Sequence, residues 1–466
     1  MWYLPEFKGQ TAFISETGES CSYEQLQGIT EKLVEHIPSR CLVFSLCSNT
    51  IGSAVGYVAF INHRIVPLLL DGHIDRELLD NFLRLYRPDY LWLPIAQSSD
   101  FEGDIVFSAY GYALLKRADE HCFPLHDDLA LLLTTSGSTG SPKLVRQSYA
   151  NLRANTQSIV EYLELDDSER AITTLPMNYV YGLSIINSHL WVGATVILTG
   201  ATLMQREFWN LFAEQQATSF GGVPYTYEML DKLLFFRRDL PSLRTMTQAG
   251  GKLLPELHRK FAEYAERTGK KFVVMYGASE ATARMGYLPS DQALRKCGSM
   301  GIAIPGGRFW LMDLEGRTIS TPDTTGELVY EGENVTLGYA EKGEDLGKGD
   351  ERNGVLYTGD MAKFDADGFF FIVGRKKRFL KIFGNRVNLD ETERLIKSHF
   401  PDMDCACAGG DDAMKIFITN SEKIKAVQSF VAEKTHLNFT AFRVSFLEQI
   451  PKNESGKTLY AGLNEL

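Results

Sequence analysis

The chain has 466 residues, of which 44% are hydrophobic and 23% are charged, an ordinary balance for a globular protein of roughly three structural units. This composition excludes a disordered chain, a collagen and a coiled coil. Its 48 lysine and arginine residues against 59 aspartate and glutamate residues leave a net charge of −11, which argues against general binding of nucleic-acid phosphates.

The cysteines and the N-terminal residues indicate the cellular compartment in which we expect the protein. Seven cysteines, an odd number scattered along the chain, do not indicate a disulfide framework, and no Cys-x-x-Cys pair or histidine cluster predicts a zinc site. The first residues lack a basic stretch followed by an apolar core, and the sequence contains no run of about 18 apolar residues. We therefore expect a soluble, cytoplasmic protein with no membrane span and no nucleic-acid partner.

The N-terminal part alternates short apolar runs with helical stretches. Runs at 42–46, 65–70 and 90–93 predict strands, and the segments 51–60 and 78–85 between them predict helices. This alternation is typical of a largely parallel sheet with crossover helices.

A second set of α/β units follows. Ser148 is a candidate N-cap for a helix in which Leu152, Ile159 and Leu163 recur at helical spacing. Further strands and helices are predicted at 194–198, 207–216, 255–267 and 271–275. The acidic body of the protein is therefore expected to contain more than one α/β layer.

Beyond Cys297 the pattern changes to short β runs at 309–312, 326–330 and 369–373. The charged, glycine-rich segment 341–354 predicts an exposed loop. From residue 375 onward 15 basic residues against 12 acidic ones give +3, which leaves −14 for the remainder of the −11 total. Composition thus predicts a large acidic body and a small, mildly basic C-terminal domain of roughly a hundred residues.

The densest cluster of small and hydroxyl residues follows the apolar run 129–133 and extends from Thr134 to Lys143. Glycines let backbone N–H groups approach a polyphosphate, hydroxyls donate further hydrogen bonds, and Lys143 adds a positive charge. The segment therefore predicts an anion cradle, with a flexible Ser/Gly loop as the alternative.

Two other site types fit the sequence poorly. A Walker loop needs Lys and then Ser or Thr directly after its second glycine, whereas Gly140 is followed by Ser-Pro-Lys. A hydrolase elbow needs Gly-x-Ser-x-Gly, and the nearest match, which begins at Gly277, lacks the final glycine.

Seven motifs occur in one order along the chain. They are the loop Thr135 to Lys143, Tyr276-Gly277-Ala278-Ser279-Glu280, Gly326-Glu327-Leu328, Tyr357-Thr358-Gly359-Asp360, Gly374-Arg375, Gly384 to Glu393, and Pro451 to Lys457. Together they resemble the adenylate-forming enzymes of the ANL superfamily, which comprises acyl-CoA synthetases, adenylation domains of nonribosomal synthetases, and luciferases. The resemblance extends from about Ser22-Tyr23 to Lys457.

The resemblance implies an α/β fold in two parts. A large N-terminal domain of layered α/β subdomains and a β-rich subdomain spans 1–374, a hinge lies at 375–377, and a small mobile α+β domain spans 378–466. The implied reaction joins a carboxylate to ATP, with Mg²⁺, to give an acyl adenylate and pyrophosphate. The acyl group then passes to CoA or to the phosphopantetheine arm of an acyl carrier protein.

The family's catalytic residues map onto matching positions. Lys457 matches the catalytic lysine, Glu280 the Mg²⁺ ligand, and Ser279 the hydroxyl that contacts the α-phosphate. The phosphate-binding loop would consist of Thr135, Ser136, Gly137, Ser138, Thr139, Gly140 and Lys143. Cations and hydrogen-bond donors suit this chemistry, because negative charge accumulates on the carboxylate, the α-phosphate and the departing pyrophosphate.

The resemblance also implies which residues bind the nucleoside and line the path of the thiol. The resemblance assigns the ribose to Asp360 and Arg375, and the hinge to Lys377. It assigns the adenine slot to Gly250, Gly251, Lys252, Tyr276 and Gly277, and the thiol side to Phe383 and Gly384. A carboxylate such as Asp360 can accept hydrogen bonds from both ribose hydroxyls.

The chain departs from the family pattern at two places. Tyr179 replaces the usual histidine, and Leu389 replaces a proline in the Gly384 stretch. The expected pocket wall comprises Tyr179, Gly221, Gly222, Val223, Pro224 and Met300. This wall is mostly apolar and fits an acyl or aryl acid, and the segment between Met177 and Leu183 has no aspartate that would bind an α-amino group.

Three functions remain open from the sequence. The favoured one is an ATP-dependent acid–thiol ligase of the acyl-CoA synthetase type. The second is an adenylating enzyme that passes its acyl group only to a carrier protein or an amine. The third is a non-catalytic ATP-binding relative, although Lys457, Asp360 and Glu280 are all present.

Overall fold

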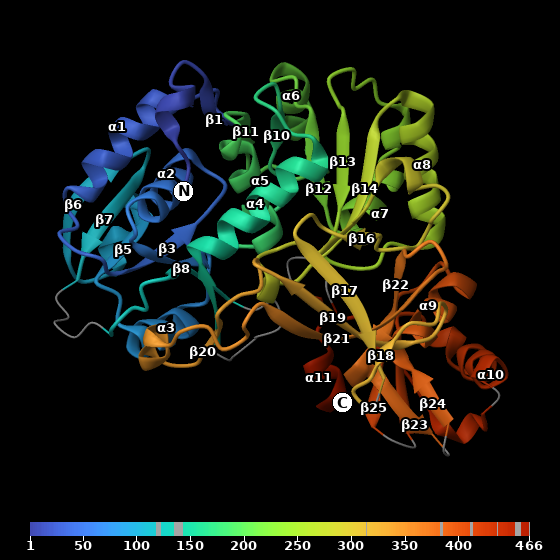
Figure 1. Ribbon diagram of the computed structural model, residues 1–466. Helices are drawn as coiled ribbons and strands as arrows, with labels where there is room; N and C mark the ends of the chain where they lie inside the picture. Colours follow the sequence, from blue (N-terminus) through green and yellow to red (C-terminus); the bar gives the residue numbers. More distant parts are fainter. Residues whose placement is uncertain are drawn as a thin grey trace. The chain divides into compact units, whose positions relative to one another are not determined.

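The computed structural model describes residues 1–117, 123–134, 143–313, 315–382, 385–410, 413–435, 437–452 and 458–465. The chain divides into two compact units: Met1–Arg308 with Tyr330–Leu356, and Phe309–Val329 with Tyr357–Leu466. Figure 1 shows the elements of both units, coloured along the sequence from blue at the N-terminus to red at the C-terminus. The mixed α/β class predicted from the sequence is confirmed. The predicted boundary at 374 and hinge at 375–377 concern which part of the chain rotates, and they stay predictions.

The first unit contains two large sheets. The first sheet consists of β1 (Thr11–Ser15), β2 (Ser20–Ser22), β10 (Arg170–Ile172), β11 (Thr195–Leu198), β12 (Ser219–Gly222), β13 (Thr245–Gln248), β14 (Lys271–Tyr276), β15 (Gly286–Leu288) and β16 (Ile302–Ala303). Its order is β16-β15-β14-β13-β12-β10-β11-β1-β2, and the strands from β14 through β12, β10 and β11 to β1 pair in parallel.

The second sheet consists of β3 (Leu42–Cys47), β4 (Val66–Asp71), β5 (Tyr90–Pro94), β6 (Asp104–Ala109), β7 (Tyr112–Lys116), β8 (Leu129–Thr134), β9 (Leu144–Ser148) and β20 (Gly338–Ala340). Its order is β20-β9-β8-β4-β3-β5-β7-β6. The parallel core predicted from the alternating runs is therefore present in β8, β4, β3 and β5, with antiparallel strands at both edges.

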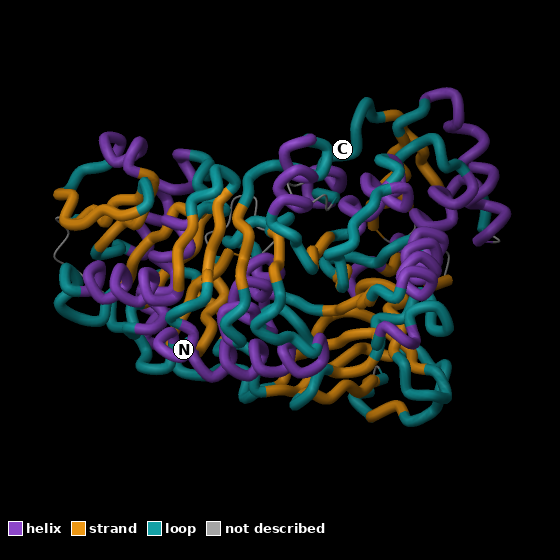
Figure 2. Tube along the Cα trace, turned by 90° about the horizontal axis from the view of Figure 1, so that it is seen from above, coloured by secondary structure: helices purple, strands orange, loops and turns teal. Residues whose placement is uncertain are grey.

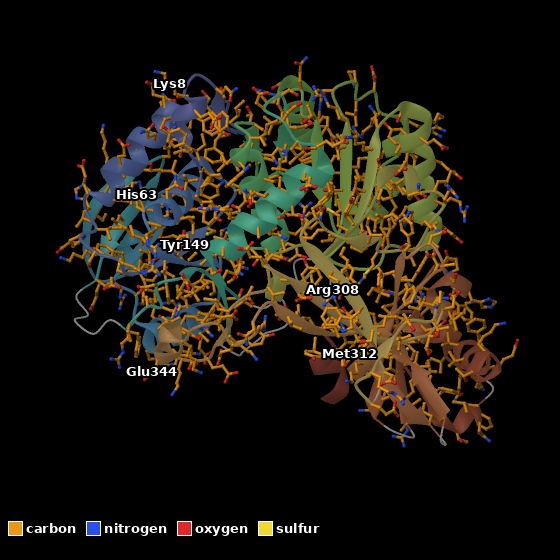
Figure 3. All side chains as sticks on the ribbon, viewed as in Figure 1. Lys8, His63, Tyr149, Arg308, Met312 and Glu344 are labelled. Carbon is orange, nitrogen blue, oxygen red and sulfur yellow. The ribbon has the colours of Figure 1, made fainter. Side chains whose placement is uncertain are left out.

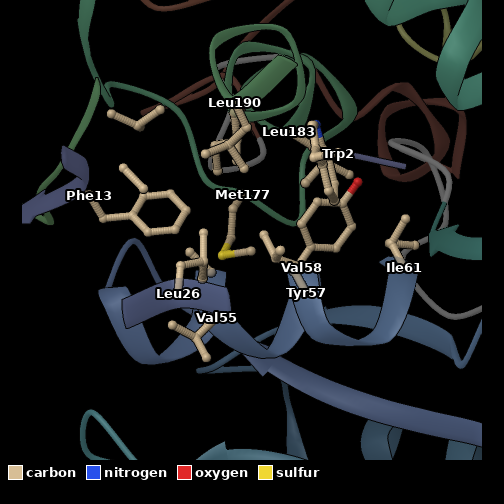
Figure 4. Packing of buried hydrophobic residues seen from close by; sticks show 14 of the residues in the cluster. Trp2, Phe13, Leu26, Val55, Tyr57, Val58, Ile61, Met177, Leu183 and Leu190 are labelled. Atoms are coloured by element: carbon tan, nitrogen blue, oxygen red, sulfur yellow. The ribbon is translucent and has the colours of Figure 1, made fainter. Parts of the chain in front are cut away.

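Helices flank and separate these sheets (Figure 2). They are α1 (Tyr23–Val34), α2 (Ile51–Asn62), α3 (Arg76–Tyr86), α4 (Tyr149–Leu163), α5 (Val180–Trp191), α6 (Arg206–Glu214), α7 (Pro224–Lys232) and α8 (Pro255–Thr268). The helices α2 and α5 are buried on almost every face, as expected for helices that are apolar all round. Figure 4 shows Met177 between Val55 of α2 and Leu183 and Leu190 of α5.

The start of α4 follows from its capping residues. The Ser148 hydroxyl accepts a hydrogen bond from the Asn151 N–H at 3.0 Å, and Asn151 Oδ1 accepts one from the Ser148 N–H at 2.8 Å. This reciprocal cap satisfies backbone groups that the first helical turn leaves without partners. The N-cap predicted at Ser148 is confirmed, and the helix begins directly after β9.

The segment 341–354 differs from its prediction. A short 3₁₀ helix, η6 (Gly343–Gly347), lies within it, and Leu346 is fully buried. Asp345 Oδ2 accepts hydrogen bonds from the backbone N–H groups of Glu341 and Lys342, at 2.9 and 3.2 Å. The Asp345 side chain supplies partners for the backbone, so Gly343, Asp345 and Leu346 are buried. Because most of the other residues in the segment are exposed, the prediction of an exposed loop is wrong only for this short helix.

The second unit has its own sheets and helices. Its strands are β17 (Gly307–Met312), β18 (Thr318–Ile319), β19 (Gly326–Gly332), β21 (Val355–Phe364), β22 (Phe370–Arg375), β23 (Phe379–Ile382), β24 (Asn385–Asn388), β25 (Cys405–Gly410), β26 (Ala413–Ile418) and β27 (Phe442–Phe446), some of which begin or end in the first unit. Its helices are α9 (Leu389–His399), α10 (Ile424–Thr435) and α11 (Tyr460–Glu465).

Leu389 illustrates how the second unit accommodates a departure from the family pattern. Leu389 is the first residue of α9 and is buried, while Asn388 Oδ1 caps the helix by accepting from the Asp390 N–H at 2.9 Å. Proline is common at the first position of a helix, because its fixed φ suits the start of a helix. The Asn388 cap allows leucine there, and the leucine side chain joins the apolar core of this unit.

Charged side chains such as Lys8 and Glu344 lie on the surface of the first unit (Figure 3). In the described part of the chain, no helix has both the length and the apolar character needed to cross a membrane.

Candidate active site

The predicted anion cradle joins β8 to β9. The two strands form an antiparallel hairpin in which Thr134 pairs with Leu144. The predicted phosphate-binding residues Thr135, Ser136, Gly137, Ser138, Thr139 and Gly140 lie outside the described residues, so their roles stay predictions. Lys143 is described, and its Nζ lies 3.7 Å from the centre of the Tyr339 ring and 3.6 Å from Glu341 Oε1.

Glu280, the predicted Mg²⁺ ligand, follows β14 in the 3₁₀ turn Ser279–Ala281. Its carboxylate Oε1 accepts a hydrogen bond from Tyr339 Oη at 2.7 Å. The Glu280 carbonyl accepts from the Thr336 N–H at 3.0 Å and from Arg352 Nη1 at 3.1 Å. Both the main chain and the side chain of this glutamate are therefore held in place.

The chemistry of Glu280 fits a bound divalent cation. Among the described residues, no lysine or arginine forms an ion pair with its carboxylate, and its one side-chain partner is the neutral phenol of Tyr339. An anionic oxygen ligand without a neighbouring cation suits a hard ion such as Mg²⁺.

Tyr339 connects Glu280 with the base of the loop. Its strand, β20, pairs with β9 so that Tyr339 lies opposite Val145. Two cations contact its ring, with Lys143 Nζ 3.7 Å and the Arg352 guanidinium carbon 4.6 Å from its centre, as in cation–π contacts. Burial, and then the Glu280 carboxylate, raise the pKa of Tyr339 to about 12, so the phenol remains a hydrogen-bond donor at neutral pH.

The chain turns tightly after Glu280. Thr282 and Ala283 both have positive φ, 51° and 91°, a region that residues with a side chain rarely occupy. A β-carbon at Gly277 would lie 1.6 Å from the Ala283 carbonyl oxygen, so only glycine fits there. Strained backbone of this kind concentrates at functional sites.

The predicted adenine turn and the predicted pocket wall lie against each other. Tyr179 is the N-cap residue of α5, and a β-carbon at Gly250 would lie 2.8 Å from Tyr179 Oη and 3.0 Å from Val223 Cγ1. A β-carbon at Gly251 would lie 3.0 Å from Pro224 Cγ. The two glycines therefore allow the main chain to approach the wall closely. Burial raises the pKa of Tyr179 to about 12.

Gly221 and Gly222 end β12 on the same side of the unit. A β-carbon at Gly221 would lie 2.9 Å from Tyr181 Oη, and that hydroxyl lies 2.8 Å from Thr247 Oγ1. A β-carbon at Gly222 would lie 2.7 Å from Thr226 Cγ2. Tyr181, which the sequence analysis did not select, thus belongs to the same wall.

Three further predicted residues, Tyr276, Lys252 and Met300, belong to the first unit. Tyr276 is half-buried at the end of β14, and Lys252 is exposed after the Gly250-Gly251 turn. Met300 is buried in the turn before β16. Their predicted contacts with adenine and the acid stay predictions.

The second unit brings the two predicted ribose residues together. Asp360 on β21 pairs with Arg375 on β22, and Asp360 Oδ1 lies 2.8 Å from Arg375 Nε. The Asp360 side chain is 8% exposed and that of Arg375 64% exposed, so the guanidinium is directed toward solvent while the carboxylate is shielded.

The predicted hinge residue Lys377 lies in the 3₁₀ turn η7 (Lys376–Arg378), and nothing is described of its side chain. Its neighbour Arg378 forms ion pairs with Asp390 Oδ1 at 2.5 Å and with Glu393 Oε1 at 2.6 Å. Tyr460 Oη donates to Glu393 Oε2 at 2.9 Å. The predicted residues Phe383, Gly384 and Lys457 lie outside the described residues, and their roles stay predictions.

Comparisons with known proteins found similar sequences and structures. A family model described as AMP-binding enzyme matches residues 84–340. Peroxisomal OPC-8:0-CoA ligase 1 from Arabidopsis thaliana is 31% identical over 72% of this chain and 63% of its own length. The oxalate–CoA ligase of the same plant is 29% identical over 71% of this chain and 66% of its own length. The match thus spans somewhat less than two thirds of these relatives.

Solved structures show the same fold. The o-succinylbenzoate coenzyme A synthetase from Bacillus subtilis in complex with ATP and magnesium ion superimposes with a TM-score of 0.79 at 19% identity. The superposition covers 99% of this chain and 98% of that synthetase.

Proposed function

Because this chain belongs to the family of AMP-binding enzymes, we propose that it joins a carboxylic acid to ATP, giving an acyl adenylate and pyrophosphate. The observation that carries this proposal is the Glu280–Tyr339–Lys143 arrangement beside the loop between β8 and β9. It places an oriented carboxylate and a cation at one loop, where a metal-bound polyphosphate needs both.

Each group at this site has a part in the proposed reaction. The loop from Thr135 to Lys143 binds the phosphates, and the Ser279 hydroxyl donates to the α-phosphate. Glu280 holds Mg²⁺, which when bound supplies positive charge to the phosphate oxygens. Lys457 holds the attacking carboxylate against the α-phosphate, so that the entering oxygen lies in line with the departing pyrophosphate.

The proposed second step transfers the acyl group to a thiol. Curated relatives carry the names of CoA ligases, which favours CoA over the phosphopantetheine arm of a carrier protein. In this proposal residues 378–466 rotate about Lys377 after adenylation, and Phe383 and Gly384 then line the path of the thiol. Asp360 and Arg375 hold the ribose in both steps.

The test measures pyrophosphate release from Mg·ATP with a panel of aliphatic, aryl and hydroxy acids, each with and without CoA. We expect release to require one class of acid and acyl-CoA to appear only when CoA is added. Acid-dependent release without acyl-CoA would assign the acceptor to a carrier protein or an amine.

A variant at the predicted catalytic lysine tests the assignment of the residue. We expect Lys457→Ala to lose acid-dependent pyrophosphate release by at least roughly 100-fold, because the developing negative charge loses its cation. Lys452→Ala is the matched control, since this nearby lysine pairs with Asp404 at 2.5 Å. Near-normal release by Lys457→Ala would refute the role of Lys457.

A further inference from the structure

One buried arginine of the first unit has no counter-ion among the residues that the structure describes. Of the described arginines, Arg146 and Arg284 are the most deeply buried, at 0% and 2% exposed. Arg146 pairs with the Glu351 carboxylate at 2.5 Å. Arg284 pairs with no carboxylate among the described residues, and its hydrogen-bond partners are all uncharged.

The contacts of Arg284 leave part of its donor capacity unused. Nε and Nη2 both donate to Ser184 Oγ, at 3.2 and 3.1 Å, while Nη1 donates to Tyr162 Oη at 2.9 Å. Nη1 also contacts Met275 Sδ at 2.8 Å, and a thioether is a weak acceptor. Nη2 carries a second N–H for which the described residues supply no acceptor.

A guanidinium in this position favours an anion. Arginine stays protonated in proteins, and burying its charge without a partner costs several kcal/mol. The Tyr181 ring, whose centre lies 5.0 Å from the guanidinium carbon, offsets part of that cost but carries no negative charge. The described residues around Arg284 therefore leave its positive charge without a neutralising partner.

The backbone of Arg284 is fixed, which suits a binding residue. Its carbonyl accepts hydrogen bonds from Asn155 Nδ2 at 2.8 Å and from Asn334 Nδ2 at 2.9 Å. Thr282 and Ala283, directly before it, hold positive φ. The main chain is therefore strained where it positions this side chain, and Arg284 is the fourth residue after Glu280.

Arg284 lies behind the predicted pocket wall. Tyr181 contacts the guanidinium on one side, and its hydroxyl reaches Thr247 and the space above Gly221 on the other. Tyr179 packs edge-on against Tyr181, with ring centres 6.4 Å apart, and its hydroxyl makes no hydrogen bond to the described residues. Among the described residues, packing against neighbours such as Tyr181 therefore holds the Tyr179 ring in the wall.

We propose that Arg284 binds a second carboxylate of the acid substrate, so that the substrate class is a dicarboxylic acid. This inference rests on the proposed function and names its substrate class. One carboxylate reacts with ATP, and the other accepts hydrogen bonds from the planar guanidinium fork, whose geometry matches a carboxylate. Ser184 and Tyr162 then orient the guanidinium.

The experiment compares each diacid with its own monomethyl ester, which has nearly the same shape but one charge fewer. Aliphatic and aryl diacids of increasing length are used, and kcat/KM is measured from pyrophosphate release. We expect one diacid to exceed its monoester by at least roughly 100-fold, because a site built to pair a polar group rejects the analogue that lacks it.

Substitutions of Arg284 test whether this residue causes the preference for the diacid over its monoester. Arg284→Met keeps most of the side-chain volume and should lower kcat/KM for the diacid by roughly 100-fold while leaving that for the monoester unchanged or higher. Arg284→Lys should restore part of the preference, since it keeps the charge but loses the fork. Arg244→Met, at an arginine whose side chain is 53% exposed, is the control and should leave both rates unchanged.

Two results would overturn the proposal: equal rates for diacid and monoester in the native protein, or an unchanged preference in Arg284→Met. Titration calorimetry of the same diacids provides a readout that does not depend on turnover. We expect the dissociation constant of the preferred diacid to rise roughly 100-fold in Arg284→Met. Failure of every acid to release pyrophosphate would refute the proposed function, whereas the calorimetry would still test Arg284, and absence of diacid binding to the native protein would refute its role.

Discussion

Tyr339 offers a test of how Glu280 is positioned, because its ring and its hydroxyl make separate contacts. Tyr339→Phe keeps the ring contacts with Lys143 and Arg352 but removes the hydrogen bond to the Glu280 carboxylate. A hydrogen bond to a charged group contributes about 1.5–3 kcal/mol. We therefore expect KM for Mg·ATP and the Mg²⁺ concentration for half-maximal activity to rise roughly 10-fold, with a smaller change in kcat.

The control for this prediction is Tyr90→Phe, which removes a phenol that donates to the His36 carbonyl at 3.2 Å, away from Glu280. Steady-state pyrophosphate release at varied Mg²⁺ measures the effect. An unchanged Mg²⁺ dependence in Tyr339→Phe, or an equal change in Tyr90→Phe, would contradict a positioning role for the Tyr339 hydroxyl.

Local motifs reveal only some of the residues at the candidate site. Ser279 and Glu280 belong to a continuous motif, so the sequence alone could select them. Tyr339 and Arg352 reach Glu280 across 59 and 72 residues, and no local pattern reports such contacts. Arg284 was missed for another reason, since an arginine in a sequence is expected at the surface and its burial depends on the fold.

At the scale of elements, the sequence predicts helix boundaries best where neighbouring residues determine them. The Ser148 cap fixed the start of α4, and the predicted helix at 255–267 corresponds to α8, Pro255–Thr268. The burial of Leu346 within the segment 341–354 could not be predicted, because the residues that it packs against lie elsewhere in the fold. Element boundaries thus follow from caps and turns, whereas burial follows from tertiary contacts.

The helix α5 carries a histidine that makes its packing sensitive to acid. His189 is 4% exposed, and its Nδ1 lies 2.8 Å from the Ile185 carbonyl oxygen. Burial, together with a smaller effect of Arg284, lowers the pKa of His189 to about 4 from 6.5. Between these two values the unfolded chain binds more protons than the folded chain, so the free energy of unfolding decreases as the pH falls through this window.

We expect His189→Met to reduce this pH dependence, because methionine stays neutral at every pH. The contribution of His189 at pH 5, relative to pH 7.5, amounts to about 2 kcal/mol. Urea unfolding of the native protein and the variant at both pH values measures it, with His73→Gln at an exposed histidine as the control. Parallel losses of stability in the native protein and in His189→Met would contradict the assignment to His189.

At the scale of the whole molecule, the proposed two-step reaction makes different demands on the two units. The first unit holds Glu280, Tyr339 and the ends of the predicted phosphate-binding loop, and the second holds the ion pair of Asp360 with Arg375. Just beyond Arg375, the ion pairs of Arg378 with Asp390 and Glu393 tie the chain to α9, and Tyr460 ties α11 to the same glutamate. Rotation about Lys377 would therefore carry these helices together.

Lys377→Pro separates the two proposed steps. Proline fixes φ near −65°, a value compatible with a 3₁₀ turn, and so opposes the backbone rotation that the second step needs. We expect acid-dependent pyrophosphate release in a single turnover to change less than roughly 3-fold, while acyl-CoA formation falls by at least roughly 100-fold. Lys377→Ala keeps the backbone free to rotate and should retain both steps. Equal loss of both steps in Lys377→Pro would mean that the substitution disturbs the fold, and full retention of acyl-CoA formation would mean that the chain does not turn at this residue.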